Sequence, residues 1–339
     1  MIHSVKDTQK PASIKEVAEA AGVSLTTVSL VLNGKGRIST DTRHRVQETA
    51  QALGFIPNKS AARLRSGRSL LLGLVVNDIS NPFFAELSSD LEAEAASSGY
   101  LSVIANTGDD LDRQSRVIDT MIGQGVAGLV VSAASGSDVS SFARLRVHNV
   151  PYVLAVREVS DPYASFVGFD NVLAGRTAAD HLAARGHRRI AFVGGPARNQ
   201  NRAERLAGAR DALRRRCIDL PDAWVRDGPA TRTFGAAAMA DLIRAAPDVT
   251  AVICFNDTVA LGAYEGLHRA ALTPGADLAV CGIDNVPEGA SWRPPLTTVE
   301  LHPRAIGRRA ARALLAAIDD PATRERVHLT PRLVVRDST

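Results

Sequence analysis

The chain has 339 residues, 45% of them hydrophobic, with 40 Lys and Arg against 36 Asp and Glu. This length allows two or three domains with buried cores. No apolar run is long enough to cross a membrane, and the N-terminal MIHSVKDTQK lacks the hydrophobic region of a secretion signal. We therefore expect a cytoplasmic protein that does not associate with membranes.

The positive charge is concentrated at the N-terminus. Residues 1–68 hold eleven Lys or Arg and five Asp or Glu, a net charge of +6, so the remaining chain carries −2 of the overall +4. A basic excess confined to one segment favours a polyanionic partner for that segment.

Residues 13–33 read as two short helices joined by a tight turn. Ser13 and Glu16 form the S-x-x-E pattern of a capping box, which places the start of the first helix. Gly22 stands where a helix ends in a left-handed residue, and Ser24 can cap a second helix. This arrangement predicts either a helix-turn-helix, whose second helix lies in a DNA major groove, or an ordinary helical hairpin.

The outer face of the second helix favours DNA binding. Thr26, Thr27 and Ser29 are hydroxyl side chains suited to phosphates and base edges, while Leu25 and Leu30 are apolar residues on the expected solvent side.

A third helix is expected to complete this small core. Ser39 or Thr40 can cap it, and Val46, Ala50 and Leu53 recur at helical spacing. Three helices within residues 1–57 predict a DNA-binding headpiece.

Residues 58–68, NKSAARLRSGR, form a separate element. Asn58 can cap a short helix, Arg63 would lie on its surface, and Leu64 has no obvious core to enter. The segment is either a basic linker or a hinge helix that folds only on DNA, because a helix this short is marginal alone. In the second case Leu64 would be a wedge inserted between base steps in the minor groove.

From residue 69 onward, strands and helices alternate. Continuous apolar runs predict strands buried on both faces: LLLGLVVND, LSVIANT, AGLVVSA, YVLAV, RIAFVGG, AVICFND and LAVCGID. The helices expected between them are 82–99, 112–125, 171–186, 202–216, 233–246 and 257–271. The alternation predicts an α/β core, residues 69–339, built from two doubly wound parallel sheets.

Ligands of such sheets bind at the carboxyl ends of the strands. The loops there lack the glycine patterns that hold dinucleotides or triphosphates, and they place polar side chains beside aromatic ones. This mixture suits a polyhydroxylated molecule, although each residue could instead be a turn or cap residue. The candidates are Asp78, Phe83, Phe84, Ser132, Arg157, Asn199, Asn201, Arg205, Asn256, Asp257, Asp284 and Asn285.

No catalytic, metal or cofactor site is predicted. Cys217, Cys254 and Cys281 are far apart and not at metal-ligand spacing, so we expect three buried free thiols and no disulfide. His187 could be a catalytic base, but a turn residue before the strand RIAFVGG is the better interpretation.

Several motifs in register resemble the LacI/GalR family of bacterial transcription regulators over nearly the full length. They are GVSLTTVSLVLNGKGRIST, GFIPN with SAARLRSGRS, NDISNPFF, RAERLAGAR, AVICFNDTVALGA, VCGIDN and PPLTTV. The resemblance implies a homodimer or a dimer of dimers, an operator-binding headpiece, hinge helices paired in the minor groove, and a two-lobed core like that of periplasmic sugar-binding proteins. It also implies three crossings between lobes, with lobe one at 69–167 and 299–325 and lobe two at 168–295 and 328–339.

The resemblance further implies roles for individual residues. Base-reading positions correspond to Leu25, Thr26 and Leu30, phosphate-contacting positions to Thr27, Ser29, Asn33, Ser39 and Thr42, and the minor-groove wedge to Leu64. Effector-contacting positions correspond to Phe83, Phe84, Asn199, Asn201, Arg205, Asn256 and Asp284.

Three departures from the family pattern stand out. Leu30 replaces a common Arg, which favours contact with a thymine methyl group over a guanine. Val156 and Arg157 replace an acidic residue, and an aromatic residue often found near residue 230 is absent. Because of these departures, the resemblance does not decide whether the effector is an ordinary sugar or a sugar derivative.

These features together predict a repressor that binds DNA through its headpiece and is controlled by a small effector bound in its core. The alternative is a sugar- or solute-binding receptor without DNA function, which would need a secretion signal and no basic headpiece. An enzyme such as a dehydrogenase or sugar kinase would need the phosphate-binding loops that are missing.

Overall fold

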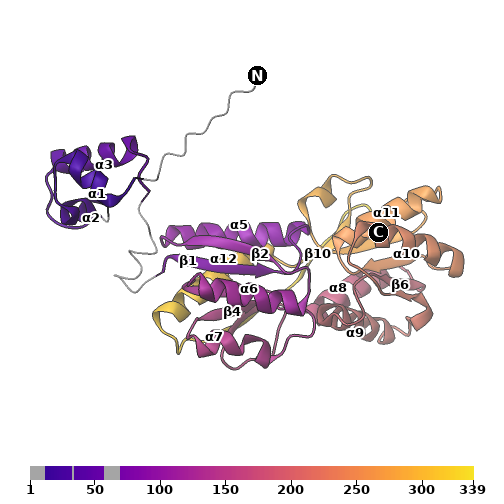
Figure 1. Ribbon diagram of the computed structural model, residues 1–339. Coiled ribbons are helices and arrows are strands. Elements are labelled where there is room, and N and C mark those ends of the chain that lie inside the picture. The colour runs from indigo at the N-terminus through magenta and orange to yellow at the C-terminus, as the bar shows by residue number, and fades with distance from the viewer. Residues whose placement is uncertain (1–11, 33, 57–68) are drawn as a thin grey trace, which may run out of the picture. The chain divides into compact units, whose positions relative to one another are not determined.

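The computed structural model describes residues 12–32, 34–56 and 69–339 (Figure 1). The chain divides into two compact units at Ser69, and each unit is described by itself. Asn33 and the predicted hinge 58–68, with Asn58, Arg63 and Leu64, lie outside the described residues.

The N-terminal unit contains the three expected helices, α1 (Ile14–Ala21), α2 (Leu25–Leu32) and α3 (Thr40–Ala52). The Ser13 hydroxyl accepts a bond from the Glu16 amide at 3.3 Å, and the Glu16 carboxylate accepts one from the Ser13 amide at 2.6 Å, so the capping box is confirmed. Gly22 has φ 64°, and α3 is capped by Ser39.

A small apolar core holds the three helices together. It consists of buried side chains from each helix, with Val17, Val28 and Val46 fully enclosed. Leu53, which we expected in this stripe, is largely exposed because α3 ends one residue before it.

The C-terminal unit contains two six-stranded sheets, as the α/β prediction requires. The first has the order β11-β5-β4-β3-β1-β2 and is entirely parallel, and the second has the order β12-β10-β9-β8-β6-β7 and is parallel except for β12. The strands are β1 (Leu71–Val76), β2 (Leu101–Asn106), β3 (Gly128–Val131), β4 (Tyr152–Ala155), β5 (Ser165–Phe169), β6 (Ile190–Val193), β7 (Val225–Arg226), β8 (Ala251–Cys254), β9 (Ala279–Asp284), β10 (Thr297–Glu300), β11 (Arg326–Leu329) and β12 (Arg332–Val334).

Helices cover both faces of each sheet (Figure 1). Those of the first sheet are α5 (Pro82–Ser97), α6 (Leu111–Gly123), α7 (Ala143–Val147) and α12 (Pro303–Asp319). Those of the second are α8 (Asn171–Ala184), α9 (Gln200–Arg214), α10 (Arg232–Ala245) and α11 (Asp257–Arg269). We call the first sheet with its helices lobe one and the second lobe two.

The chain crosses between the lobes after β5, after β10 and after β11. Because β5 runs to Phe169 and β11 pairs with it, residues 168–169 and 328–329 belong to the first sheet, whereas we had placed them in lobe two. Residues 299–300 belong to β10 of the second sheet, whereas we had placed them in lobe one. The predicted lobe boundaries are displaced because β5, β10 and β11 are short strands that no long apolar run marks in the sequence.

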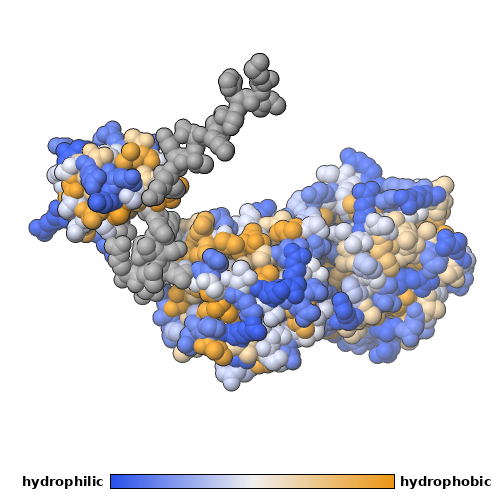
Figure 2. Space-filling view, viewed as in Figure 1, coloured by the Kyte–Doolittle hydropathy of each residue, from blue (hydrophilic) through white to orange (hydrophobic). Residues whose placement is uncertain are grey.

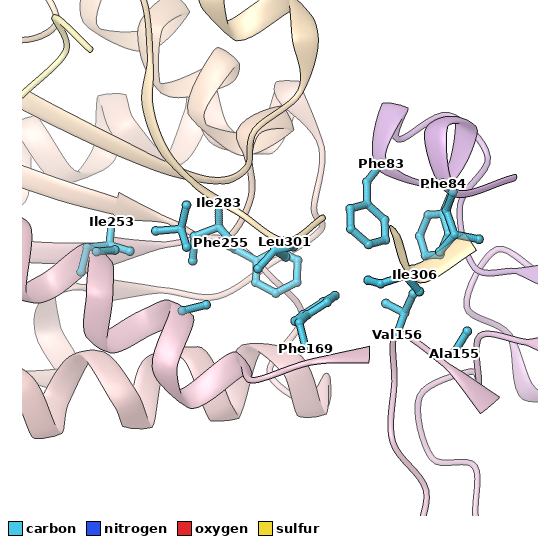
Figure 3. Close-up of a cluster of buried hydrophobic side chains, with 14 of the residues drawn as sticks. Phe83, Phe84, Ala155, Val156, Phe169, Ile253, Phe255, Ile283, Leu301 and Ile306 are labelled. Carbon is cyan, nitrogen blue, oxygen red and sulfur yellow. The ribbon is translucent and has the colours of Figure 1, made fainter. Parts of the chain in front are cut away.

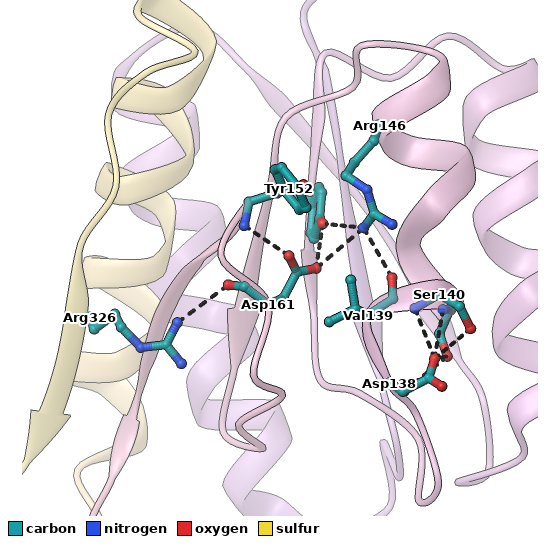
Figure 4. A network of polar contacts seen from close by, with 9 residues as sticks. Asp138, Val139, Ser140, Arg146, Tyr152, Asp161 and Arg326 are labelled. Carbon is teal, nitrogen blue, oxygen red and sulfur yellow. Dashed lines mark hydrogen bonds and ion pairs between the residues drawn. The ribbon is translucent and has the colours of Figure 1, made fainter.

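The outer loops of lobe one are fixed by a buried polar network (Figure 4). The Tyr152 hydroxyl donates to the Asp161 carboxylate at 2.5 Å, and Arg146 donates to the Tyr152 oxygen at 3.1 Å. Arg326 of β11 donates to the Asp161 carbonyl at 3.4 Å, which ties the returning chain to the β4–β5 connection.

Two burial predictions for the C-terminal unit are wrong. The run LSVIANT forms β2, an edge strand paired only with β1, so its side chains are not enclosed and Leu101, Val103 and Ile104 are exposed. Figure 2 shows apolar residues gathered on the surface of the core over α5 and β2.

Cys217 is exposed because it lies just beyond the end of α9, while Cys254 and Cys281 are buried in the second sheet.

None of the helices in the described parts of the chain has the length and apolar character needed to span a membrane.

Candidate functional site

A cavity of about 260 Å³ lies between the two lobes, at the carboxyl ends of their strands. Nine of the twelve candidate effector residues line it: Asp78, Phe83, Phe84, Arg157, Asn199, Asn201, Arg205, Asn256 and Asp284. Six further lining residues with polar or aromatic side chains were not predicted: Asn77, Asn81, Asp109, Phe169, Thr231 and Phe255.

Ser132, one of the three remaining candidates, does not line the cavity. Its side chain is 2% exposed and its hydroxyl donates to the Asn77 carboxamide oxygen, so it supports the cavity floor from behind. Asn77 in turn donates to the Ala133 carbonyl at 3.1 Å and to Asp109 at 3.2 Å.

Asp257 and Asn285 also lie behind the cavity. Asp257 accepts bonds from the Thr298 hydroxyl at 2.7 Å and the Val286 amide at 2.9 Å, and burial raises its pKa to about 6. Asn285 accepts a bond from Arg336 at 2.8 Å. Both residues therefore fix the loop that carries Asp284.

Phenylalanine rings form the apolar part of the cavity wall. Phe83 meets Phe84 and Phe169 edge to face, with ring centroids 5.4 and 6.0 Å apart. Figure 3 shows Phe83, Phe84 and Val156 of lobe one together, with Phe169 at the end of β5, also in lobe one, lying toward Phe255 of lobe two. Such rings offer flat apolar surfaces to the carbon skeleton of a ligand.

Arg205 is held between two of these rings. Its guanidinium carbon lies 4.8 Å from the Phe255 ring centre and 5.7 Å from that of Phe169. Its Nε donates to the Asn171 carboxamide oxygen at 3.0 Å and its Nη1 to the Phe255 carbonyl at 2.6 Å. Burial lowers the pKa of Arg205, while Asp284 opposes this shift.

Asp284 connects the two lobes directly. Asn81, the cap of α5 in lobe one, donates to the Asp284 carboxylate of lobe two at 3.3 Å. Burial raises the pKa of Asp284 to about 7, against the opposing effect of Arg205.

Lobe two contributes three asparagine side chains to the cavity. Asn199 and Asn256 cap α9 and α11 with their oxygens, which leaves their NH₂ groups for a ligand. Asn201 is buried in the first turn of α9 and lines the cavity beside them. These donors can bind hydroxyl or carbonyl oxygens.

The predicted DNA-binding residues of the N-terminal unit lie along α2 and at the start of α3. Leu25 is 49% exposed and Thr26 is exposed, while Thr27, Ser29 and Leu30 are half-buried. Leu30 packs beside Gly36, so it is less exposed than we expected. Thr27 shares a 2.9 Å hydrogen bond with Ser24, and the Ser39 hydroxyl donates to Thr42 at 2.8 Å.

No cluster of three or more His, Cys, Asp or Glu side chains suited to a metal ion occurs in residues 12–32, 34–56 and 69–339. His187 shares a 3.0 Å hydrogen bond with Thr250 and does not line the cavity.

Comparison with known proteins identifies both units. Residues 13–58 match the model of bacterial regulatory proteins of the lacI family, and residues 179–339 match the periplasmic binding protein-like domain. The maltose regulon regulatory protein MalI of Escherichia coli (strain K12) is 37% identical over 263 residues, which cover 78% of this chain and 77% of MalI. The ribose operon repressor of the same strain is 30% identical over 328 residues, 96% of this chain and 99% of that protein.

A solved structure of the lac repressor dimer bound to operator and the anti-inducer ONPF has the same fold, with a TM-score of 0.83 and 27% identity. The similarity covers 97% of this chain and 99% of the lac repressor chain. The chain belongs to the lacI family of bacterial regulatory proteins.

Proposed function

We propose that this chain is a transcriptional repressor whose affinity for operator DNA is controlled by a small polyhydroxylated effector, a sugar or a sugar derivative. One observation carries this proposal: the same chain holds a helix-turn-helix and an interlobe cavity lined by amide groups and aromatic rings. The lac repressor relative, a dimer bound to operator and ONPF, supports a DNA partner and a small ligand.

The DNA side of the proposal rests on α2 as the recognition helix. Leu25, Thr26 and Leu30 would read bases, and Thr27, Ser29, Ser39 and Thr42 would contact phosphates, together with Asn33 and Asn58. Arg63 and Leu64 of the hinge segment would enter or border the minor groove.

The effector side rests on the chemistry of the two walls. Asn199, Asn201, Asn256 and Arg205 would bind ligand oxygens, and Phe83 with its neighbouring rings would cover the carbon skeleton. Effector binding would favour one arrangement of the lobes, and its differential affinity for the two arrangements would set the change in operator affinity.

We also propose a homodimer. Leu101, Val103 and Ile104 form an exposed apolar surface on the edge strand β2, and exposed apolar patches of this kind mark protein interfaces. A second copy of the chain would cover this surface and bring two headpieces to the two half-sites of an operator.

The proposed setting is the cytoplasm, where operator DNA lies, and the proposed role is not enzymatic. The relatives are named as regulatory proteins and repressors, and the receptor alternative would leave the helix-turn-helix without a use.

A gel-shift assay with the DNA upstream of the chain's own gene tests the proposal. We expect a salt-sensitive specific complex. The variant Thr26→Asp places a negative charge on the exposed face of α2 and should abolish this complex while leaving the core intact. Wild-type protein that binds this DNA no better than unrelated DNA would contradict the proposal.

A further inference from the structure

The loop after β4 has an unusual backbone where it lines the cavity. Val156 has φ 69°, and the Arg157 amide donates to the Ala155 carbonyl at 2.7 Å, which makes a γ-turn centred on Val156. A β-branched residue rarely adopts a positive φ, and backbone strain of this kind concentrates at binding sites. Arg157, the residue after this turn, lines the cavity.

The Arg157 guanidinium is buried at the cavity wall with only part of its hydrogen-bonding capacity used. Its side chain is 9% exposed. Its Nη1 donates to the Asp109 carboxylate and the Ala133 carbonyl, each at 2.5 Å. Its Nε is buried without a hydrogen-bond partner, and within the described residues no hydrogen bond joins its Nη2 to another group.

The unused edge of Arg157 has the shape of an anion site. Nε and Nη2 point in parallel from one side of a guanidinium, and a carboxylate or phosphate accepts both bonds with two oxygens. Leaving the buried Nε donor unpaired is unfavourable, so a ligand that supplies acceptors along this edge gains binding energy.

A second guanidinium faces the same cavity from the opposite lobe. The positive charge of Arg157 is one of the influences that lower the pKa of Arg205, after the larger effect of burial. An anion placed between Arg157 of lobe one and Arg205 of lobe two would relieve this repulsion and draw the lobes together.

The remaining charges leave room for one anion. Asp109 is already bound by Arg157, by Asn77 and by the amide and hydroxyl of Ser135. Below about pH 7, the raised pKa of Asp284, this carboxyl is mostly protonated, and two guanidinium groups with the Asp109 carboxylate then give the cavity interior a net positive charge, while Asp78 lies at the exposed mouth.

We infer that the effector is an acidic sugar derivative whose carboxylate or phosphate binds the Nε and Nη2 edge of Arg157 and bridges to Arg205. This inference rests on the proposed function and narrows its effector class. Neutral sugars would leave the Arg157 edge unpaired and would bind more weakly.

Thermal unfolding of the full-length protein tests the inference with matched probes at equal concentration. The probes are D-glucose, D-gluconate, D-glucose 6-phosphate, D-ribose and D-ribose 5-phosphate. We expect at least one anionic probe to raise the unfolding temperature more than its neutral parent, and the carboxylate and phosphate probes separate the two kinds of anion. If neutral parents act as well as their derivatives, or if no anionic probe acts, the inference is wrong.

Three variants separate anion binding from a structural role. Arg157→Gln should weaken binding of the active anionic probe about 10- to 100-fold, the range for a hydrogen bond to a charged group. Asp109→Asn removes the internal counter-ion and should strengthen that binding, whereas a purely structural ion pair predicts no gain. Arg189→Gln, an exposed residue outside the cavity, is the matched control and should change nothing.

The ligand-binding experiment and the gel-shift experiment can fail independently of each other. A chain that binds operator and responds only to a neutral sugar keeps the proposed function and overturns the anionic effector. A chain that binds an anionic sugar but no DNA keeps the inference about Arg157 and overturns the repressor.

Discussion

Replacing Asp284 with Asn should change how the stability of the core depends on pH. The Asp284 carboxyl is buried between the lobes, where it accepts a hydrogen bond from Asn81. Burial raises its pKa from 3.8 to about 7; Arg205 and the Asn81 bond lower it, and Asp257 raises it. Asn has a similar shape and stays neutral at every pH, so Asp284→Asn removes this titration.

The direction in which the free energy of unfolding changes with pH depends on whether the folded or the unfolded chain binds the Asp284 proton. Between pH 3.8 and about 7 the folded protein keeps the Asp284 proton that the unfolded chain releases, so the free energy of unfolding falls as pH rises through this window. At about 1.4 kcal/mol per pH unit over roughly three pH units, the loss reaches about 4 kcal/mol above pH 7. At pH 8 the variant should therefore be more stable than the wild type by up to this amount, and near pH 4 the two should be similar.

Denaturant unfolding of the full-length protein at several pH values between 4 and 8 measures this difference. Asp257→Asn is a useful comparison, because the raised pKa of Asp257 is about 6 and its effect should end one pH unit lower. Stability curves of wild type and Asp284→Asn that run parallel across this range would refute the reasoning.

Three further predictions concern packing, capping and base recognition. Gly175→Ala would place a Cβ 1.8 Å from the Arg205 carbonyl oxygen, so the core should lose about 1–3 kcal/mol or more by denaturant unfolding, whereas Gly123→Ala, with no atom within 4 Å, should be neutral or slightly stabilising. Ser13→Ala removes the α1 cap and should destabilise the N-terminal unit by about 1 kcal/mol, seen as faster hydrogen exchange of the α1–α3 amides with unchanged exchange in the core. Leu30→Arg should shift the preferred base at its contact from thymine toward guanine by about 1–3 kcal/mol in a binding-site selection, and an unchanged selected site would contradict the assigned position.

The sequence predicted the parts of the site that follow from local rules. The capping box at Ser13 and the left-handed Gly22 depend on neighbouring residues, which a sequence displays directly. The rule that ligands bind at the carboxyl ends of parallel strands placed residues that follow five separate strands in one cavity. Distance along the chain did not matter, because strand direction aligns all these ends at one edge of each sheet.

The errors concern properties that only the assembled sheets determine. The run containing Val103 resembles a buried strand, and only the strand order reveals that β2 lies at the edge. Phe255 lies in the apolar run AVICFND, so the sequence indicates a core residue, although the residue also lines the cavity. Ser132 follows β3 as the other site residues follow their strands, but its side chain turns toward Asn77 behind the wall.

The chemical difference between the two cavity walls bears on how an effector could act at a distance. Lobe one supplies three of the four phenylalanine rings and the Arg157 edge, while lobe two supplies Phe255, Arg205 and three of the five asparagine amides. A polyhydroxylated anion bound to one wall alone would leave part of its carbon skeleton and part of its oxygens unmatched, so its full binding energy is available only when both lobes contact it. The effector must then bind one lobe arrangement more tightly than the other, and this differential affinity is what ligand control of DNA binding requires.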